Sequence, residues 1–280
     1  MSYKDLLVVL DADPPARGRI DLAAALAERF AARLVGLYTL PVPRLPRELG
    51  YYPALVEPLF SELQERAREA ADAVREHFEQ VTRARGVSSE WRQLPDDAEA
   101  DPAIHARYAD LTILGQLDPD RSDVDIVRPR PEHVALACGR PVLVVPYAGR
   151  FENVGRRVLI GWNATREAAR AVADAIPLLA AAEVVTVLTI DAQEGPRGHG
   201  ALPGADISLH LARHGVKAAI EQAVSADLSV GDVLLSRAAD LGADLLVMGA
   251  YGHSRVRELL LGGATRALLH SMTVPVLMSH

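Results

Sequence analysis

The sequence Ala243-Asp244-Leu245, close to the C-terminal end, repeats Ala109-Asp110-Leu111, and Pro275-Val276-Leu277 repeats Pro141-Val142-Leu143. Both repeats have the same offset, because 243 − 109 and 275 − 141 each give 134. An ungapped repeat of this kind indicates that one structural unit occurs twice. The alternative is a pair of unrelated α/β domains that share aliphatic strands.

Short aliphatic runs alternate in both halves with segments of helical apolar spacing. Segments 20–31 and 165–181 predict helices that cross over a sheet. This alternation predicts an α/β fold with two tandem, doubly wound parallel-sheet domains of Rossmann-like type. The predicted strands are Leu6–Leu10, Arg33–Leu40, Leu111–Gly115 and Pro141–Val145 in the first half, and Val158–Gly161, Glu183–Ile190, Val216–Val224, Leu245–Gly249 and Val274–Met278 in the second.

The boundary between the two units is expected where glycines interrupt the pattern, between Tyr147 and Gly155. We therefore predict domains at residues 1–148 and 155–280. Two stretches fall outside the repeated plan: 41–60, with five prolines, and 191–206, with four glycines. The glycines of the second stretch lack the spacing of a dinucleotide fingerprint, which favours a surface loop.

Composition limits the classes of function. The chain has 280 residues, of which 49% are apolar, and a net charge of −7, enough for two domains with buried cores. The apolar run Leu6–Leu10 is too short for a membrane span and lacks the layout of a signal peptide, so we expect a cytoplasmic protein with no membrane partner. The negative charge, without clusters of Lys and Arg, argues against a nucleic-acid partner.

The single cysteine restricts metal and disulfide sites. Cys138 alone excludes an internal disulfide and any zinc site that needs two thiolates from one chain. His105, His133 and His270 have no metal-ligand spacing to an acidic or cysteine partner, and we interpret them as structural. No metal site is predicted.

The strongest chemical signal is a pair of glycine clusters near the C-terminal end. Gly249 and Gly252 follow a predicted buried strand, and after nine further residues Gly262-Gly263-Ala264-Thr265 opens a predicted helix. Glycine lets the backbone approach a ligand, and the free N–H groups of a helix N-terminus favour an anion such as phosphate. The alternative is that these are ordinary turn glycines with no ligand. Thr265 adds a hydroxyl, and His253 is either a phosphate contact or a solvated loop residue.

This spacing, Gly-x-x-Gly, nine residues, then Gly and a small residue, resembles the ATP-binding signature of the universal stress protein family. The resemblance covers nearly the whole chain and implies a fold like that of the adenine nucleotide alpha hydrolases. It also implies an adenine nucleotide as the partner and ATP as the bound cofactor, with accompanying Mg left open. The implied contacts are Asn163, Thr189, Met248, Gly249, Gly252, His253, Gly262, Gly263, Ala264 and Thr265.

Two of these positions depart from the family pattern. Gly263 stands where the family usually has Ser or Thr, so a hydroxyl contact to phosphate is missing although the N–H remains. Asn163 stands where the family has an Asp at the end of the first strand, a place that Asp11 holds in the first half. An Asn can still form hydrogen bonds, but it brings no charge.

The offset of 134 residues predicts that the first half does not bind ATP in the same way. Gly249 corresponds to Gly115, but Gly252 corresponds to Asp118, Gly262 to Arg128 and Gly263 to Pro129. Asp118 would repel phosphate, and proline removes an N–H donor. Further replacements are Pro119 for His253 and Pro131 for Thr265.

Three functional hypotheses remain. The first is a stress or signalling protein that acts through ATP occupancy of its C-terminal domain, with slow hydrolysis at most. The second is an ATP-dependent hydrolase or phosphotransferase, although the sequence contains no P-loop lysine motif or nucleophile elbow and offers no catalytic residue. The third is an ATP-independent scaffold. We also expect the closing strands Pro141–Val145 and Val274–Met278 to pair within one chain as a pseudo-dimer, with a homodimer of whole chains left open.

Overall fold

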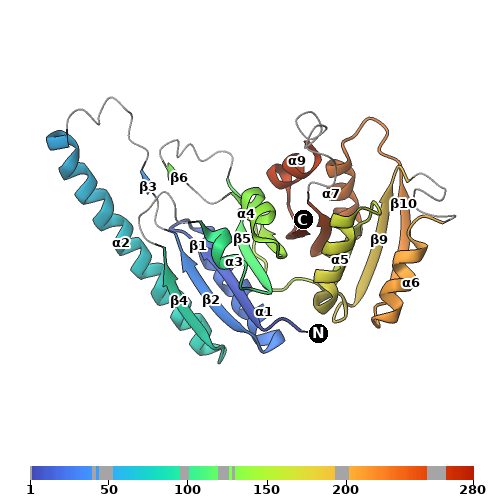
Figure 1. Ribbon diagram of the computed structural model, residues 1–280, viewed down its shortest axis with the longest axis horizontal. Coiled ribbons are helices and arrows are strands. Elements are labelled where there is room, and N and C mark those ends of the chain that lie inside the picture. Colours follow the sequence, from blue (N-terminus) through green and yellow to red (C-terminus); the bar gives the residue numbers. More distant parts are fainter. Residues whose placement is uncertain are drawn as a thin grey trace.

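The computed structural model describes residues 2–39, 42–43, 53–94, 101–118, 126–127, 130–192, 202–250 and 263–280. A single ten-stranded sheet runs through both halves of the chain, with the order β10-β9-β8-β11-β12-β7-β5-β1-β2-β4 (Figure 1). The first five strands of this order come from the C-terminal half and the last five from the N-terminal half. The fold is therefore α/β and mostly parallel, as predicted.

The elements alternate along the chain in both halves. The N-terminal half consists of β1 (Asp5–Leu10), α1 (Pro15–Phe30), β2 (Arg33–Tyr38), β3 (Val42–Pro43), α2 (Pro53–Ala84), β4 (Ser89–Gln93), α3 (Pro102–Ala106), β5 (Leu111–Gly115), β6 (Ile126–Val127), α4 (Pro131–Cys138) and β7 (Val142–Val145). The C-terminal half consists of β8 (Arg157–Gly161), α5 (Arg166–Leu179), β9 (Val184–Ile190), α6 (Ala205–Arg213), β10 (Ala218–Ala223), α7 (Val230–Asp240), β11 (Leu245–Gly249), α9 (Gly263–Ser271) and β12 (Val276–Ser279). Strands β3 and β6 pair in a separate two-stranded sheet.

The two halves of the main sheet are joined by their closing strands. β7 and β12 pair antiparallel, with Leu143 opposite Leu277 and Val144 opposite Val276. The other pairs of this sheet among the described strands are parallel. The predicted pairing of the closing strands within one chain is confirmed, and β12 lies between β11 and β7 in the middle of the sheet.

Helices cover both faces of the sheet, and each face has its own buried cluster. Helices α1, α2, α5 and α6 contribute to one cluster, and α3, α4, α7 and α9 contribute to the other. Each cluster contains residues from both halves of the chain, so the joint between the halves is also packed with apolar side chains. The central strands have continuous aliphatic runs, which are typical of strands that are covered on both faces of the sheet.

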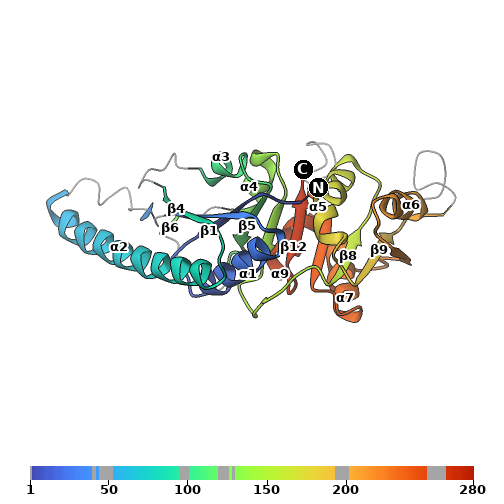
Figure 2. The same ribbon diagram turned by 90° about the horizontal axis from the view of Figure 1, so that it is seen from below.

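Two elements differ from the sequence prediction. Residues 41–60 were expected to lie outside the plan, but helix α2 begins at Pro53, a residue that is compatible with a helix start. Figure 2 shows α2 extending past the sheet at one end of the molecule. Strand β4, with the sequence Ser-Glu-Trp-Arg-Gln, was not predicted, because it is an edge strand without an aliphatic run. Among the described helices, none is long and apolar enough to cross a membrane.

Candidate functional site

Each half contains one topological switch point of the kind at which α/β proteins bind ligands. In the N-terminal half, β1 lies between β2 and β5. The chain passes from β1 to β2 on one side, whereas β5 and β7 lie on the other side of β1. β8 lies in the same way between β9 and β11. Ligands of open α/β sheets bind outside the carboxyl ends of the strands at such switch points. The candidate positions are therefore the ends of β1 and β5 and the ends of β8 and β11.

Asn163 forms a turn that starts helix α5 at the end of β8. Its Oδ1 accepts hydrogen bonds from the main-chain N of Thr165, at 3.3 Å, and from Thr165 Oγ1, at 2.8 Å. Thr165 in turn caps α5, because its Oγ1 accepts from the main-chain N of Ala168 at 3.3 Å. The side-chain oxygen of Asn163 thus accepts hydrogen bonds from within the protein, whereas the NH2 group of the same exposed side chain can still donate to a ligand.

Gly249 ends β11 against the first turn of α5. A Cβ at this position would lie 2.5 Å from the main-chain N of Ala168 and 2.6 Å from the carbonyl carbon of Glu167. The absence of a side chain therefore allows a helix to pack closely against the end of the strand. The sequence had indicated only a close approach to a ligand.

Thr189 and Met248 are held in the sheet near the same edge. Thr189 is fully buried, and its hydroxyl donates to the carbonyl oxygen of Glu221 on β10 at 3.5 Å. Met248 is half-buried and packs on the cluster that contains α7 and α9.

Helix α9 carries the second glycine cluster. It begins at Gly263, with Ala264 as the next residue, and Thr265 in its first turn is buried at 7% exposure. Leu268 and Leu269 are buried and belong to the same core cluster as Leu246, so they anchor the helix to the sheet. Gly252, His253 and Gly262 lie outside the described residues.

Glu167 is a residue at this edge that the sequence reasoning missed. It lies in the first turn of α5 beside Gly249, is 4% exposed, and forms an ion pair with Arg166. Burial acts to raise its pKa, but hydrogen bonds from Arg166 and the main chain, with the positive charges of Arg166 and His280, outweigh this and lower the pKa. Its position two residues after the Thr165 cap is a helix-start signal that could have identified it.

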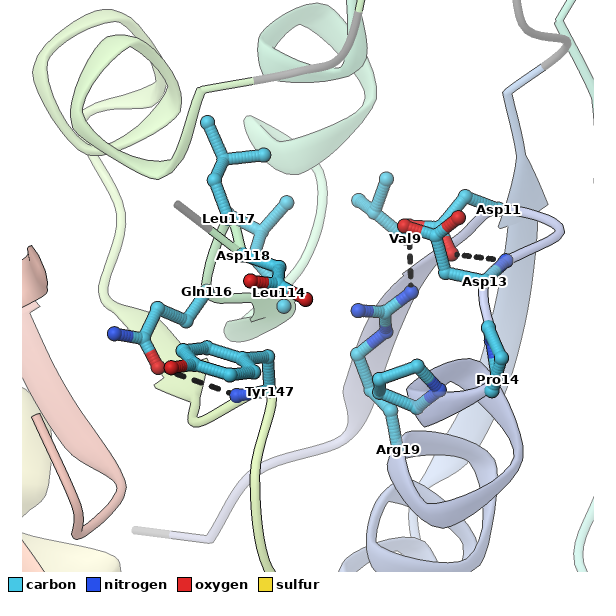
Figure 3. Close-up of a pocket in the computed structure, with 12 residues that line it drawn as sticks. Val9, Asp11, Asp13, Pro14, Arg19, Leu114, Gln116, Leu117, Asp118 and Tyr147 are labelled. Atoms are coloured by element: carbon cyan, nitrogen blue, oxygen red, sulfur yellow. Dashed lines mark hydrogen bonds and ion pairs between the residues drawn. The ribbon is translucent and has the colours of Figure 1, made fainter. Parts of the chain in front are cut away.

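The N-terminal crevice is a cavity of about 410 Å³ at the ends of β1 and β5. Arg19 extends from α1 into it and forms an ion pair with Asp11 at 2.9 Å between Nη2 and Oδ2 (Figure 3). Asp11 also accepts from the main-chain N of Asp13 at 3.0 Å, the same turn that Asn163 makes in the other half. A Cβ on Gly115 would lie 1.8 Å from Arg19 Nη1, so this glycine makes room for the guanidinium.

Three carboxylates line the N-terminal crevice. Asp11, Asp13 and Asp118 line it, with Arg19 as the only cation among its described lining residues. Burial, followed by the charges of Asp11 and Asp13, raises the pKa of Tyr38 to about 12, so its hydroxyl stays protonated at neutral pH.

The helix that corresponds to α9 differs in the N-terminal half. The 134-residue offset aligns the start of α9 at Gly263 with residue 129, but α4 begins two residues later, at Pro131. Proline at the first helical position has no N–H to offer an anion. Pro119, Arg128 and Pro129 lie outside the described residues.

No group of three or more His, Cys, Asp or Glu side chains that could hold a metal ion occurs within the described part of the chain. His133, which the sequence reasoning interpreted as structural, contacts Asp101 Oδ2 through Nε2 at 2.9 Å.

Comparison with known proteins links the C-terminal half to one family. Residues 155–280 match the model of the universal stress protein family. Universal stress protein Slr1230 of Synechocystis sp. is 50% identical over 38 residues, which are 14% of this chain and only 13% of that relative.

Two solved structures align with both halves. A universal stress protein from Archaeoglobus fulgidus has a TM-score of 0.68 at 15% identity, over 98% of this chain and 94% of that one. A Pseudomonas aeruginosa structure named for the same family has a TM-score of 0.53 at 17% identity, over 98% and 92% of the two chains. At these identities the likeness shows a common tandem fold.

Proposed function

We propose that this chain, whose residues 155–280 match the universal stress protein family model and whose N-terminal half has the same fold, binds one ATP in its C-terminal domain. We propose domains at residues 1–148 and 155–280, of which the second is the nucleotide-binding one. The bound nucleotide would act as a signal in a stress response within the cytoplasm, with slow hydrolysis at most.

The observation that carries this proposal is the difference between α9 and α4. Helix α9 begins on Gly263, which has no side chain to stand between an anion and the main-chain N–H groups of the first turn. Helix α4 begins on Pro131, two residues later in the repeat. Because the N-terminal N–H groups and the helix dipole favour an anion, α9 is the better phosphate site.

The nucleoside part would lie outside the carboxyl ends of β8 and β11. Met248 and Gly249 form the end of β11 at this edge, and the exposed amide of Asn163 can donate to a sugar hydroxyl or a base acceptor. The hydroxyl of Thr189 already bonds to Glu221, so we propose a packing role for Thr189. The phosphates would meet the main chain from Gly249 to Gly252 and from Gly262 to Thr265.

The test is to purify the protein, release bound small molecules by denaturation and identify them by mass spectrometry. Co-purified ATP or AMP in about equal molar amount to the chain supports the proposal, and a Gly262→Val variant purified in parallel should lack it. Protein that carries no nucleotide, and that takes up none when incubated with Mg-ATP, would favour the scaffold hypothesis instead.

A further inference from the structure

Gln116 connects the two halves of the molecule at one end of helix α9. It follows β5, is 7% exposed, and its main-chain N donates to the carbonyl oxygen of Val145 at 2.8 Å. Its side-chain Oε1 accepts from the main-chain N of Tyr147 at 3.2 Å (Figure 3). Gln116 is therefore held firmly by the N-terminal half.

These bonds fix the direction of the side-chain amide. Because the N–H of Tyr147 requires an acceptor, Oε1 must face it, and Nε2 faces the C-terminal half. Nε2 donates to the carbonyl oxygens of Leu269, at 2.8 Å, and His270, at 2.9 Å. Both carbonyls belong to the last turn of α9, where the helix itself supplies no donors.

The C-terminal half holds the end of α4 differently, because Arg170 of α5 donates to the carbonyl oxygen of Gly139 at 3.2 Å and no described side chain of that half inserts there as Gln116 does at α9. Helix α4, the counterpart of α9, ends on Gly139 in the left-handed conformation at φ 67°, a C-cap within its own half. The residue that corresponds to Gln116 in the other half is Ala250, since 116 + 134 gives 250, and its side chain has no donor. The N-terminal half thus caps α9 through Gln116, whereas the equivalent position of the C-terminal half has no side-chain donor for α4.

We propose that Gln116 is a positioning residue for the phosphate-binding end of α9, and that the ATP-free N-terminal half serves the C-terminal site through this contact. Helix α9 has nine residues and is about 13 Å long at a rise of 1.5 Å per residue, so it moves as one short rod. Holding its C-terminal carbonyls fixes where Gly263 presents its N–H group at the other end. This inference rests on the proposed function and adds a reason for the tandem arrangement.

The binding test compares three variants by calorimetric titration with Mg-ATP at a temperature where all are folded. Gln116→Leu removes the donor, and we expect the Kd to rise at least threefold. Gln116→Glu keeps an acceptor for Tyr147 but turns a carboxylate toward two carbonyls, so its Kd should rise more. Tyr3→Phe is the matched control, because it removes another bond between the halves, from Tyr3 Oη to the carbonyl oxygen of Asp174 at 2.7 Å, without touching α9. Its Kd should equal that of the wild type.

A second measurement does not depend on ATP. Amide hydrogen exchange of nucleotide-free protein should be at least tenfold faster in α9 for Gln116→Leu than for the wild type, whereas Tyr3→Phe should leave α9 unchanged. Wild-type protein that fails to bind Mg-ATP would refute the proposed function, and the exchange result alone would then decide the role of Gln116. Equal exchange of α9 in all proteins, or a Kd unchanged in both Gln116 variants of an ATP-binding protein, would overturn the inference.

Discussion

Replacing Gly249 by alanine tests whether this glycine is required by the fold before any ligand is present. The new Cβ would lie 2.5 Å from the main-chain N of Ala168, where ordinary contact begins at 3.4 Å. The first turn of α5 would have to retreat by about 0.9 Å, the difference between these distances. Because the obstructing atoms are main chain, the strain cannot be relieved by a rotamer change. Overpacking of this kind costs about 1–3 kcal/mol, and we expect the upper end of that range.

The assay is urea denaturation of the nucleotide-free protein at 25 °C. The matched control is Gly18→Ala in α1, where a Cβ meets nothing within 4 Å. Alanine is favoured over glycine inside a helix, so this variant should be more stable than the wild type by about 0.5–1 kcal/mol. If Gly249→Ala were as stable as the wild type while Gly18→Ala behaved as expected, the packing argument for Gly249 would be wrong.

Three further predictions concern a helix cap, the joint and the loop. Asp101 caps α3 through Ala103 N and contacts His133; burial acts to raise its pKa, but these bonds outweigh it and lower the pKa. Asp101→Asn should keep the cap but lower the free energy of unfolding by about 0.5–1 kcal/mol at pH 7, measured by urea titration. Because the pKa of Asp101 is depressed in the folded protein, this stability difference between variant and wild type should disappear as the pH falls below about 4. Deletion after Thr273 removes β12 from mid-sheet and should cause aggregation by light scattering; a soluble, equally stable variant would contradict this. Gly263→Ser restores a hydroxyl donor and should strengthen Mg-ATP binding by about 0.5–1.5 kcal/mol in calorimetry, whereas weaker binding would argue against a phosphate at this residue.

Local patterns in the sequence were sufficient to predict the architecture. Central strands such as β5 and β11 are buried on both faces, so their aliphatic runs predicted their bounds correctly. The repeated Pro-Val-Leu indicated two equivalent closing strands, and these form the joint between the halves. Thr165 is at the start of the predicted helix and caps α5.

Features that depend on distant contacts could not be predicted in this way. Strand β4 lies at the edge of the sheet and is held by its pairing with β2. Its sequence has no aliphatic run that would have indicated a strand. The ion pair of Arg19 with Asp11 requires the helix and strand geometry to be known. Gln116 bonds to a carbonyl that lies 153 residues away in the chain. Gly249 was selected as a ligand contact, although its packing against α5 appears only in three dimensions.

The most direct test of the central claim is the stoichiometry of Mg-ATP binding, measured by isothermal titration of the full chain and of Gly262→Val. We expect one site per chain in the wild-type protein. The valine side chain at the entrance of the helix should weaken that site at least tenfold, which is about 1.4 kcal/mol. Two sites per chain, or an affinity that Gly262→Val leaves unchanged, would contradict the assignment of ATP to the C-terminal glycine loop.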